Sequence, residues 1–274
     1  MKRHLGVLLT VVGTALAFLA VASAAQATPP AAPYQDFAGC PSPAEDDTVA
    51  FCLKTVTDGG HIQFGKKNVP ITNPIVLRGG LSQLTGSFVA NSEGGIVPVR
   101  QTVEGGLVGL TGLSWLDEAL AGKEQLKVYA VVELAGQPSS LLELPFSLPI
   151  KIHLENAVLG NSCYVGSNEN PIQLNLTTGT TNPPAPNTPI SGQEFSELAP
   201  EAGRPEVLTG ENGIFVDNSY AVPKANGCVL NIGSQHYNID WLVNAATGLP
   251  AAAGTNTTVQ DFDISVVSPQ VVYP

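Results

Sequence analysis

The sequence predicts a mainly β fold: an antiparallel, β-sandwich-like domain with one or two short helices. Three observations predict it. The chain of 274 residues has only 12 basic and 23 acidic side chains but 28 glycines and 22 prolines, which is typical of short strands joined by turns. Three segments alternate apolar and polar residues, as strands with one wet face do. Four cysteines form an even set that can cross-link such a fold.

Residues 1–27 predict export. Lys2 and Arg3 form a short positive start, residues 5–22 are apolar and uncharged, and two tandem small-x-small patterns follow, as in a secretory signal peptide. We expect cleavage after Ala27. An uncleaved membrane anchor is the alternative, because the apolar run approaches the ~20 residues that span a bilayer. The predicted location is therefore secreted, extracellular or cell-wall-associated.

The mature chain is acidic. Cleavage would leave 247 residues, with 10 basic against 23 acidic side chains and a net charge of −13. Nucleic acid and anionic membrane surfaces are therefore poor partners. The sequence after residue 27 holds no second apolar span, so we expect no membrane span after signal cleavage. A cell-wall or other extracellular partner stays open, as does the oligomeric state.

The cysteines are Cys40, Cys52, Cys163 and Cys228. We expect disulfides rather than free thiols or a zinc site, because an exported chain meets an oxidising environment and no C-x-x-C motif is present. Three pairings are possible. We favour Cys40 with Cys52 and Cys163 with Cys228, because the first pair flanks a proline-rich loop and the alternatives tie the N-terminus to distant elements.

The domain organisation follows from the prolines. Residues 28–47 predict an extended, proline-rich arm that is tied down at Cys40. Residues 48–274 predict a single β-rich extracellular domain. A second proline-rich stretch, at 180–189, is either a stiff linker with an internal break or a loop of one domain, and a disulfide across it would make it a loop.

Glycine motifs mark the first half of the domain. Residues 51–57 and 61–64 flank Asp58-Gly59-Gly60, which predicts a hairpin turn. A charged residue, two glycines and an aliphatic residue then recur three times, which predicts tight turns or bulges in a β-meander. The three motifs are Arg78-Gly79-Gly80-Leu81, Glu93-Gly94-Gly95-Ile96 and Glu104-Gly105-Gly106-Leu107.

The clearest strands follow at 126–134, 148–155 and 172–177. In 148–155 the even positions are aliphatic, whereas Lys151 and His153 occupy odd positions. The other two segments alternate in the same way. Three strands with one wet face each predict an antiparallel sheet that is packed on one side.

Two short helices are predicted. Ser114 can cap the first amides of a helix that ends near Gly122. Apolar residues recur at helical spacing over 238–247 and are followed by Gly248, which predicts the second helix.

The remaining segments carry weaker patterns. Residues 190–225 are predicted to be irregular except for a strand at 214–216. Residues 261–266 alternate and predict an edge or pairing strand near the end of the chain.

Two parts of the chain resemble known sequences. One comprises LPIKIHLEN (148–156), LGNSCYVGS (159–167) and residues 171–179, and the other is GLPAAAGTNT (248–257). These blocks are similar to a group of secreted actinobacterial proteins that has no assigned activity. The resemblance implies export and a surface or extracellular setting. It implies no catalytic residue and no ligand.

The histidines and serines form no recognisable catalytic motif. His61, His153 and His236 show neither H-E-x-x-H nor a close pair, and His153 is expected to be solvated on the polar face of its strand. No serine has the G-x-S-x-G setting of a nucleophile elbow. The nearest match surrounds Ser162, which we interpret as a turn residue.

Acidic and aromatic side chains are equally uninformative. Asp261 with Asp263, and Lys151 with Glu155, are each expected to form a solvated strand face. The cluster at residues 45–47 is acidic but lacks the EF-hand pattern that calcium would favour. Both tryptophans, Trp115 and Trp241, are expected to pack in the core, because each lies on a predicted helix beside apolar neighbours. We therefore predict no catalytic residue, no cofactor site and no metal site.

The functional expectation is correspondingly broad. We expect a secreted or cell-wall-associated, non-enzymatic β protein with a structural or binding role at the cell envelope. The alternative is a secreted hydrolase, directed at glycans or esters, whose active site forms only in the fold. Two carboxylates in a deep pocket would favour the hydrolase, since glycosidases need only two acids about 5 to 10 Å apart.

Overall fold

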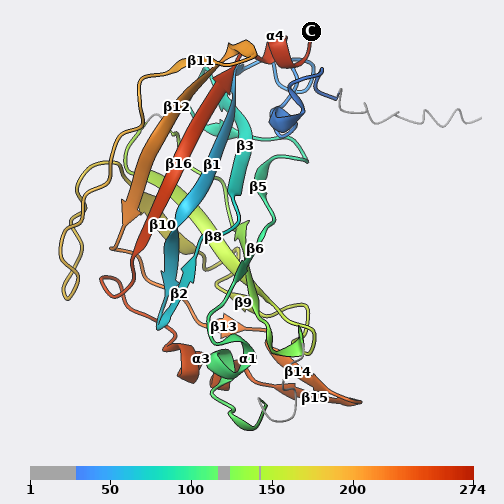
Figure 1. The fold of residues 1–274 in the computed structure, drawn as a ribbon, viewed down its shortest axis with the longest axis vertical. Helices are drawn as coiled ribbons and strands as arrows, with labels where there is room; N and C mark the ends of the chain where they lie inside the picture. The colour runs from blue at the N-terminus through green and yellow to red at the C-terminus, as the bar shows by residue number, and fades with distance from the viewer. Residues whose placement is uncertain (1–28, 117–123, 142) are drawn as a thin grey trace, which may run out of the picture.

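The computed structural model describes residues 29–116, 124–141 and 143–274. The predicted leader, and most of the helix expected between Ser114 and Gly122, lie outside the described residues. The predicted fold class is confirmed: antiparallel strands form two large sheets that pack together, with short helices toward the ends of the molecule (Figure 1). Among the helices in the described ranges, none combines the length and the apolar character that crossing a membrane requires.

The first sheet has eight strands, and its main path runs β11-β12-β16-β1-β3-β4. In that order the strands span Ala199–Glu201, Arg204–Asp217, Thr258–Val267, Val49–Phe64, Ile75–Ser82 and Phe88–Val89. Strand β2 (Lys67–Pro70) pairs with β1, and β5 (Gly95–Val97) pairs with β3.

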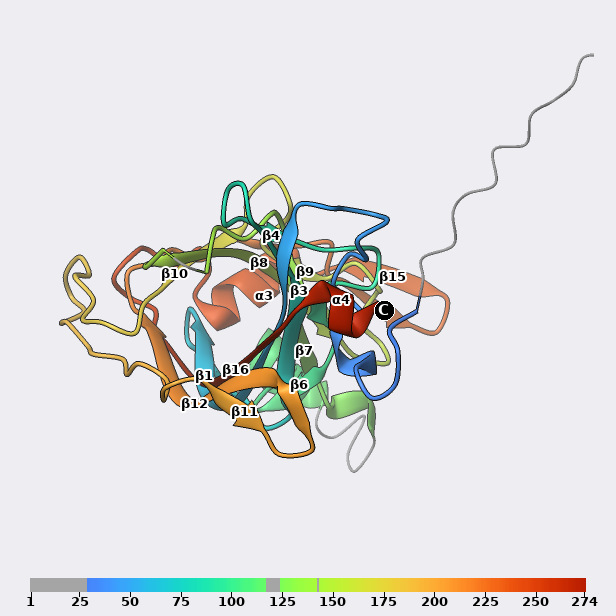
Figure 2. The same cartoon turned by 90° about the horizontal axis from the view of Figure 1, so that it is seen from above.

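The second sheet has six strands, and its main path runs β13-β9-β8-β7-β6. In that order the strands span Ala225–Asn226, Tyr164–Val165, Phe146–Glu155, Tyr129–Leu134 and Arg100–Thr102, and β10 (Ile172–Leu176) pairs with β8. The predicted one-sided strands at 148–155 and 172–177 are confirmed as β8 and β10. The one predicted at 126–134 is shorter, because β7 begins at Tyr129, and it is not one-sided, because the consecutive residues Ala130, Val131 and Val132 are all buried. Seen from above, β8 and β10 lie on the opposite side of the core from β1, β16 and β12 (Figure 2).

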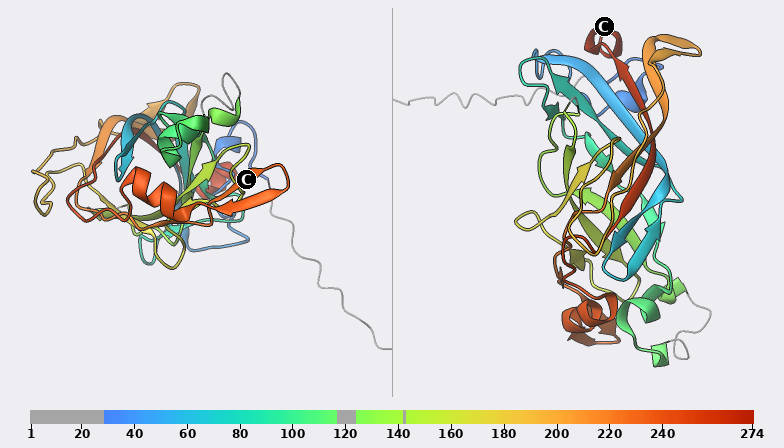
Figure 3. Two further views of the ribbon diagram at one scale, coloured as in Figure 1. Left: turned by 90° about the horizontal axis from the view of Figure 1, so that it is seen from below. Right: turned by 90° about the vertical axis from the view of Figure 1, so that its left-hand side faces the viewer.

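The helices are short, and two of them lie side by side at the end of the molecule far from the C-terminus (Figure 3). These are α1 (Gly106–Thr111) and α3 (Asp240–Thr247), next to the hairpin of β14 (Val229–Ile232) and β15 (Gln235–Asn238). Helix α3 confirms the predicted second helix, and it ends at Gly248 with a φ of 72°. Further helical elements with described bounds are η1 (Gln35–Phe37), η2 (Glu124–Leu126) and α4 (Pro269–Val272).

Two disulfides cross-link the fold, and they confirm the pairing that the sequence favoured. Cys40 bonds Cys52 with a Cα–Cα distance of 5.3 Å, and Cys163 bonds Cys228 with a distance of 4.1 Å. The Cys163–Cys228 bond spans the proline-rich stretch at 180–189. That stretch is an internal loop: its Asn187 side chain donates to the carbonyl of Asn218 at 2.8 Å.

The arm at 28–47 is not extended over its described part. It forms turns and the helix η1, and Phe37 is fully buried in a second, smaller core. Asp36 pairs with Lys54 at 2.6 Å and with Arg204 at 2.7 Å. Burial raises the pKa of Asp36, but hydrogen bonds from Arg204 and Lys54 outweigh it, so the pKa lies below its usual range. Apolar burial and ion pairing therefore fold the arm against the sheet.

The predicted hairpin at Asp58-Gly59-Gly60 is wrong, because β1 runs through it without a turn. The pairing of β1 with β16 instead shifts register between Thr57 and Gly59, which is a β-bulge. Gly60 has a φ of 89°, and a Cβ there would lie 2.0 Å from the carbonyl oxygen of Val259. The turn-forming residues thus serve a bulge in a strand that is paired on both sides.

The three glycine-pair motifs do not share one structure. Gly79 and Gly80 lie inside β3 rather than in a turn. A glycine is needed at position 79 because a Cβ there would lie 2.5 Å from the Phe88 ring. The motif at 93–96 does form the turn that precedes β5. Gly105, with a φ of 78°, is the N-cap of α1. Only the second motif fits the predicted meander.

The region 190–225 is more regular than predicted. It contains β11 and the 14-residue strand β12, of which the sequence predicted only the part at 214–216. The register shift between Gly210 and Gly213, with Asn212 at a φ of 61°, interrupts the alternation that would have revealed this strand. The predicted final strand is β16, which is not at an edge but pairs with both β12 and β1.

Both tryptophan predictions are wrong. Trp241 is 70% exposed and Trp115 is 50% exposed. Helix α3 instead buries Val243 and Thr247, so its inward face is set by packing against the sheets and α1 rather than by its largest apolar residue.

Candidate functional site

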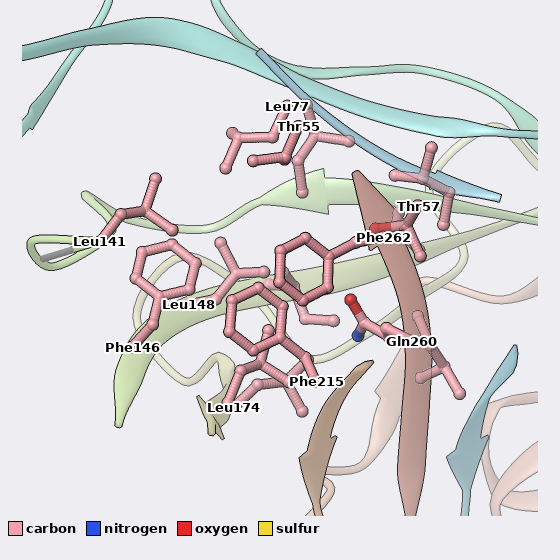
Figure 4. Close-up of a pocket in the computed structure, with 16 residues that line it drawn as sticks. Thr55, Thr57, Leu77, Leu141, Phe146, Leu148, Leu174, Phe215, Gln260 and Phe262 are labelled. Carbon is pink, nitrogen blue, oxygen red and sulfur yellow. The ribbon is translucent and has the colours of Figure 1, made fainter. Parts of the chain in front are cut away.

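The candidate site is an apolar cavity between the two sheets, together with a groove that leads to the surface. The cavity has a volume of about 40 Å³. Figure 4 shows side chains from both sheets pointing into it, with rings and aliphatic groups making most of the lining. Among the described residues that line it, the polar ones are Thr55, Thr57 and Gln260.

Strand alternation explains how the sequence builds this lining. Strand β8 points Phe146, Leu148 and Ile150 into the cavity because successive even positions share one face. From the opposite sheet, β16 contributes Gln260 and Phe262 by the same rule.

Four of the nine phenylalanines form a row from the interior to the surface. The ring centroids of Phe146 and Phe215 lie 6.4 Å apart, and Phe215 stacks on Phe262 at 3.9 Å (Figure 4). Phe262 meets Phe195 edge to face at 6.1 Å. Phe146 is buried whereas Phe195 is 36% exposed, so the row connects the cavity with the solvent.

Two glycines make room for this row. A Cβ at Gly213 would lie 2.5 Å from the Phe262 ring, and one at Gly210 would lie 2.4 Å from the Phe195 ring. Larger residues at either position would displace a ring. These glycines in β12 are therefore part of the site.

The groove has a volume of about 450 Å³ and shares Leu141, Phe215 and Phe262 with the cavity. These three side chains form the wall between the two spaces. On the solvent side the groove is lined by Leu144 and Leu198, which are 49% and 41% exposed. An apolar surface that is both concave and exposed is the usual signature of a binding site.

One side of the groove is an edge segment that lies along β12. Gln193 and Ile214 exchange two backbone hydrogen bonds, of 2.9 and 2.8 Å, and the N–H of Ser196 donates to the carbonyl of Glu211 at 2.8 Å. The connection between β7 and β8, which carries Leu141, forms the facing side. The groove therefore opens between an edge of the first sheet and a connection of the second.

The rim of the groove is acidic. Glu194 and Glu197 line it, together with the hydroxyl groups of Ser196 and Thr178. The described residues that line the groove include no Lys, Arg or His.

A second pocket, of about 460 Å³, lies on the outer face of the second sheet, and His153 lines it. His153 was expected to be solvated, but its side chain is only 15% exposed, because the Tyr164 ring stacks on it at 4.4 Å. Its Nδ1 lies 3.6 Å from a carboxylate oxygen of Glu133 and 3.6 Å from one of Glu155. Its Nε2 is buried and has no hydrogen-bond partner in the described part of the chain.

The two carboxylates beside His153 are each paired with a cationic side chain. Arg100 pairs with Glu155 at 2.6 Å, and Lys151 pairs with Glu133 at 3.4 Å. Burial raises the pKa of Tyr164, and the neighbouring Glu133 carboxylate raises it further. The predicted solvated pair of Lys151 and Glu155 is therefore part of an ion-pair cluster.

Comparisons with protein-family models, with curated proteins and with solved structures find no match. The resemblance to secreted actinobacterial proteins therefore stays a prediction.

The other candidate residues have local structural roles. Ser162 lies in a turn, as predicted, and its hydroxyl donates to the carbonyl of Gly227 at 3.1 Å. Glu45 accepts from the N–H of Ser42 at 2.8 Å, so it caps a turn. Asp263 accepts from the N–H of Asn212 at 2.9 Å.

The two remaining histidines are not brought together with carboxylates. The Nδ1 of His236 lies 2.5 Å from the Asn231 side chain, and burial lowers the pKa of His61. Across the described ranges, no group of three or more His, Cys, Asp or Glu residues is placed to hold a metal ion.

Sequence reasoning missed the groove and the cavity. Phe195, Phe215 and Phe262 are far apart in the chain, and two pairings bring them together: that of β12 with β16, and that of the edge segment at 193–196 with β12. The available signal was local: two glycines lie within a β-rich stretch that also carries phenylalanine, which marks close approach of another group.

Proposed function

We propose that this chain is exported and acts outside the cell or at the cell envelope as a non-enzymatic binding protein. Its site is the groove, and the ligand is an apolar chain such as an alkyl or acyl chain. The row of phenylalanine rings from the exposed Phe195 to the buried Phe146 carries the proposal. Export is supported by the leader-like sequence and by the two disulfides.

The dimensions favour a ligand that occupies the groove. A volume of about 450 Å³ is within the usual range for small-molecule sites, whereas a cavity of about 40 Å³ has room for little more than water. Each methylene that the groove removes from water contributes about 0.8 kcal/mol. A chain of several methylenes therefore gains enough to bind without a specific polar contact. Its end enters the cavity only if Phe215 and Phe262 move apart.

A fluorescence titration with Nile red, a neutral apolar probe, tests this proposal. We expect saturable binding of one probe molecule per chain, weakened at least tenfold by Leu144→Asp combined with Leu198→Asp. The matched control is Leu84→Asp, because Leu84 is 75% exposed and does not line the groove. No binding by the unaltered chain, or equal weakening by the control, would refute the proposal.

A secreted hydrolase, directed at glycans or esters, is the second candidate, and one observation favours it. Glu133 and Glu155 flank His153 beside a pocket, an arrangement that acid–base chemistry can use. Incubation with p-nitrophenyl glycosides and esters tests it. Turnover that disappears in both Glu155→Gln and His153→Gln, but survives the groove variant, would replace the binding proposal.

A further inference from the structure

The charged side chains among the described residues that line the groove are all acidic. Glu194 and Glu197 are the acidic residues of a lining whose other described members are apolar except for Thr178 and Ser196, and the described lining contains no cationic side chain. Both glutamates are exposed, so they lie where a ligand would leave the groove for water. The chain as a whole has 12 basic against 23 acidic residues, so the wider field has the same sign.

The position of a ligand in this groove follows from its two ends. The apolar end gains free energy by covering Phe195, Leu198 and Leu144. A charged end cannot follow it inward, because burying an unpaired charge is costly. The charged end therefore stays at the rim, beside Glu194 and Glu197.

We propose that the groove selects apolar chains that end in a cationic group, such as a primary alkylamine, over chains that end in a carboxylate. This rests on the proposed binding of an apolar chain in the same groove. An ammonium at the rim is attracted by two carboxylates, whereas a fatty-acid carboxylate is repelled by both. An alcohol of equal chain length carries no charge, so its affinity is the reference for the other two.

The expected preference is moderate because the rim is exposed. Each pair of exposed charges contributes little, so the two carboxylates should give about a 2- to 30-fold difference in affinity between amine and alcohol. The carboxylate should bind more weakly than the alcohol by a similar factor. Half-molar salt should remove most of the difference, since it screens charges over a few ångströms.

The experiment is isothermal titration of the disulfide-bonded mature chain with dodecylamine, dodecanol and dodecanoate, at neutral pH, low salt and concentrations below micelle formation. We expect one site per chain, with the amine bound most tightly and the carboxylate least. The variant Glu194→Gln/Glu197→Gln should bring the three affinities within about twofold of each other. Its matched control is Glu93→Gln/Glu169→Gln, which removes the same charge from exposed positions outside the groove.

The outcomes separate this inference from the proposal beneath it. If none of the three compounds binds, the groove is not an apolar-chain site and both fail. If all three bind with equal affinity, the groove binds chains but the rim does not select them, which overturns the inference alone. The same conclusion follows if the carboxylate binds best, or if the control variant abolishes the preference as fully as the rim variant does.

Discussion

The two faces of strand β8 form two contrasting regions. Its even-numbered residues face the core, and three of them, Phe146, Leu148 and Ile150, line the cavity between the sheets. Its odd-numbered residues, Lys151, His153 and Glu155, form the polar cluster on the outer face. One alternating segment thus supplies both candidate sites, and the choice between them depends on which has unsatisfied capacity to interact.

The charged groups of the outer cluster largely pair with one another, and the buried Nε2 of His153 is the polar atom there that has no hydrogen-bond partner among the described residues. The two carboxylates of the cluster are paired with Arg100 and Lys151, and the rings of His153 and Tyr164 cover each other. The groove, in contrast, exposes apolar side chains that have no packing partner over much of their surface: Leu144 is 49% exposed and Leu198 is 41% exposed. The region with more charged groups is therefore the weaker candidate for a binding site. An exposed apolar surface with a route to the core is the stronger indication here.

The largest expected effect comes from the wall between groove and cavity. Phe262→Ala should lower the free energy of unfolding by about 3–5 kcal/mol, because the ring is buried and stacks on Phe215. Urea denaturation measures this. Trp241→Ala is the control, since its side chain is 70% exposed, and should stay within about 0.5 kcal/mol of the unaltered chain. Equal effects would mean that the wall is not packed as described.

A smaller effect is expected from the glycine behind that ring. Gly213→Ala places a Cβ 2.5 Å from the Phe262 ring, which must shift, at a cost of about 1–3 kcal/mol. It should also change the Nile red affinity, because the displaced ring lines the groove. Gly179→Ala is the matched control, because the nearest atom to its Cβ, the Thr177 hydroxyl oxygen, lies at 3.4 Å. If thermal melts show the same decrease in Tm for both variants, the close fit between Gly213 and the Phe262 ring is contradicted.

The same comparison shows what the sequence could predict. Strands β8 and β10 were predictable because each buries one face, so polarity alternates residue by residue. Strand β12 was not, because a bulge at Asn212 breaks its alternation. The turn residues at 58–60 misled for a related reason, since local sequence cannot distinguish a bulge from a hairpin when both need a positive φ.

The candidate site was less predictable than the fold. The alternation of 148–155 predicted that His153 faces away from the core, and it does, but not that Tyr164 from β9 would cover it. The exposure of Trp241 and the row of phenylalanines likewise depend on how sheets and helices meet. Such contacts join residues that are distant in the chain, and composition or periodicity does not encode them.

The smallest expected effect concerns the outer cluster. Burial and the Glu133 carboxylate, 3.5 Å from its hydroxyl, raise the pKa of Tyr164. Tyr164 therefore ionises at lower pH in the unfolded chain, so its contribution to stability is lost as pH rises from about 10 through the folded pKa. Glu133→Gln should move the Tyr164 transition to lower pH. Tyr164→Phe should flatten the alkaline loss of stability by less than about 1 kcal/mol, since the cluster is partly exposed.

Absorbance at 295 nm measures this ionisation, and the difference between the unaltered chain and Tyr164→Phe isolates one tyrosine among six. Tyr34, Tyr220 and Tyr273 also have raised pKa values, but the carboxylates that contribute are Glu206 for Tyr34, Asp217 for Tyr220, and Glu45 and Glu93 for Tyr273, rather than Glu133. Glu133→Gln should therefore shift only the Tyr164 component. If the whole tyrosine curve moves instead, the cluster is coupled to the fold rather than self-contained. The outer cluster and the groove could then not be treated as two separate regions.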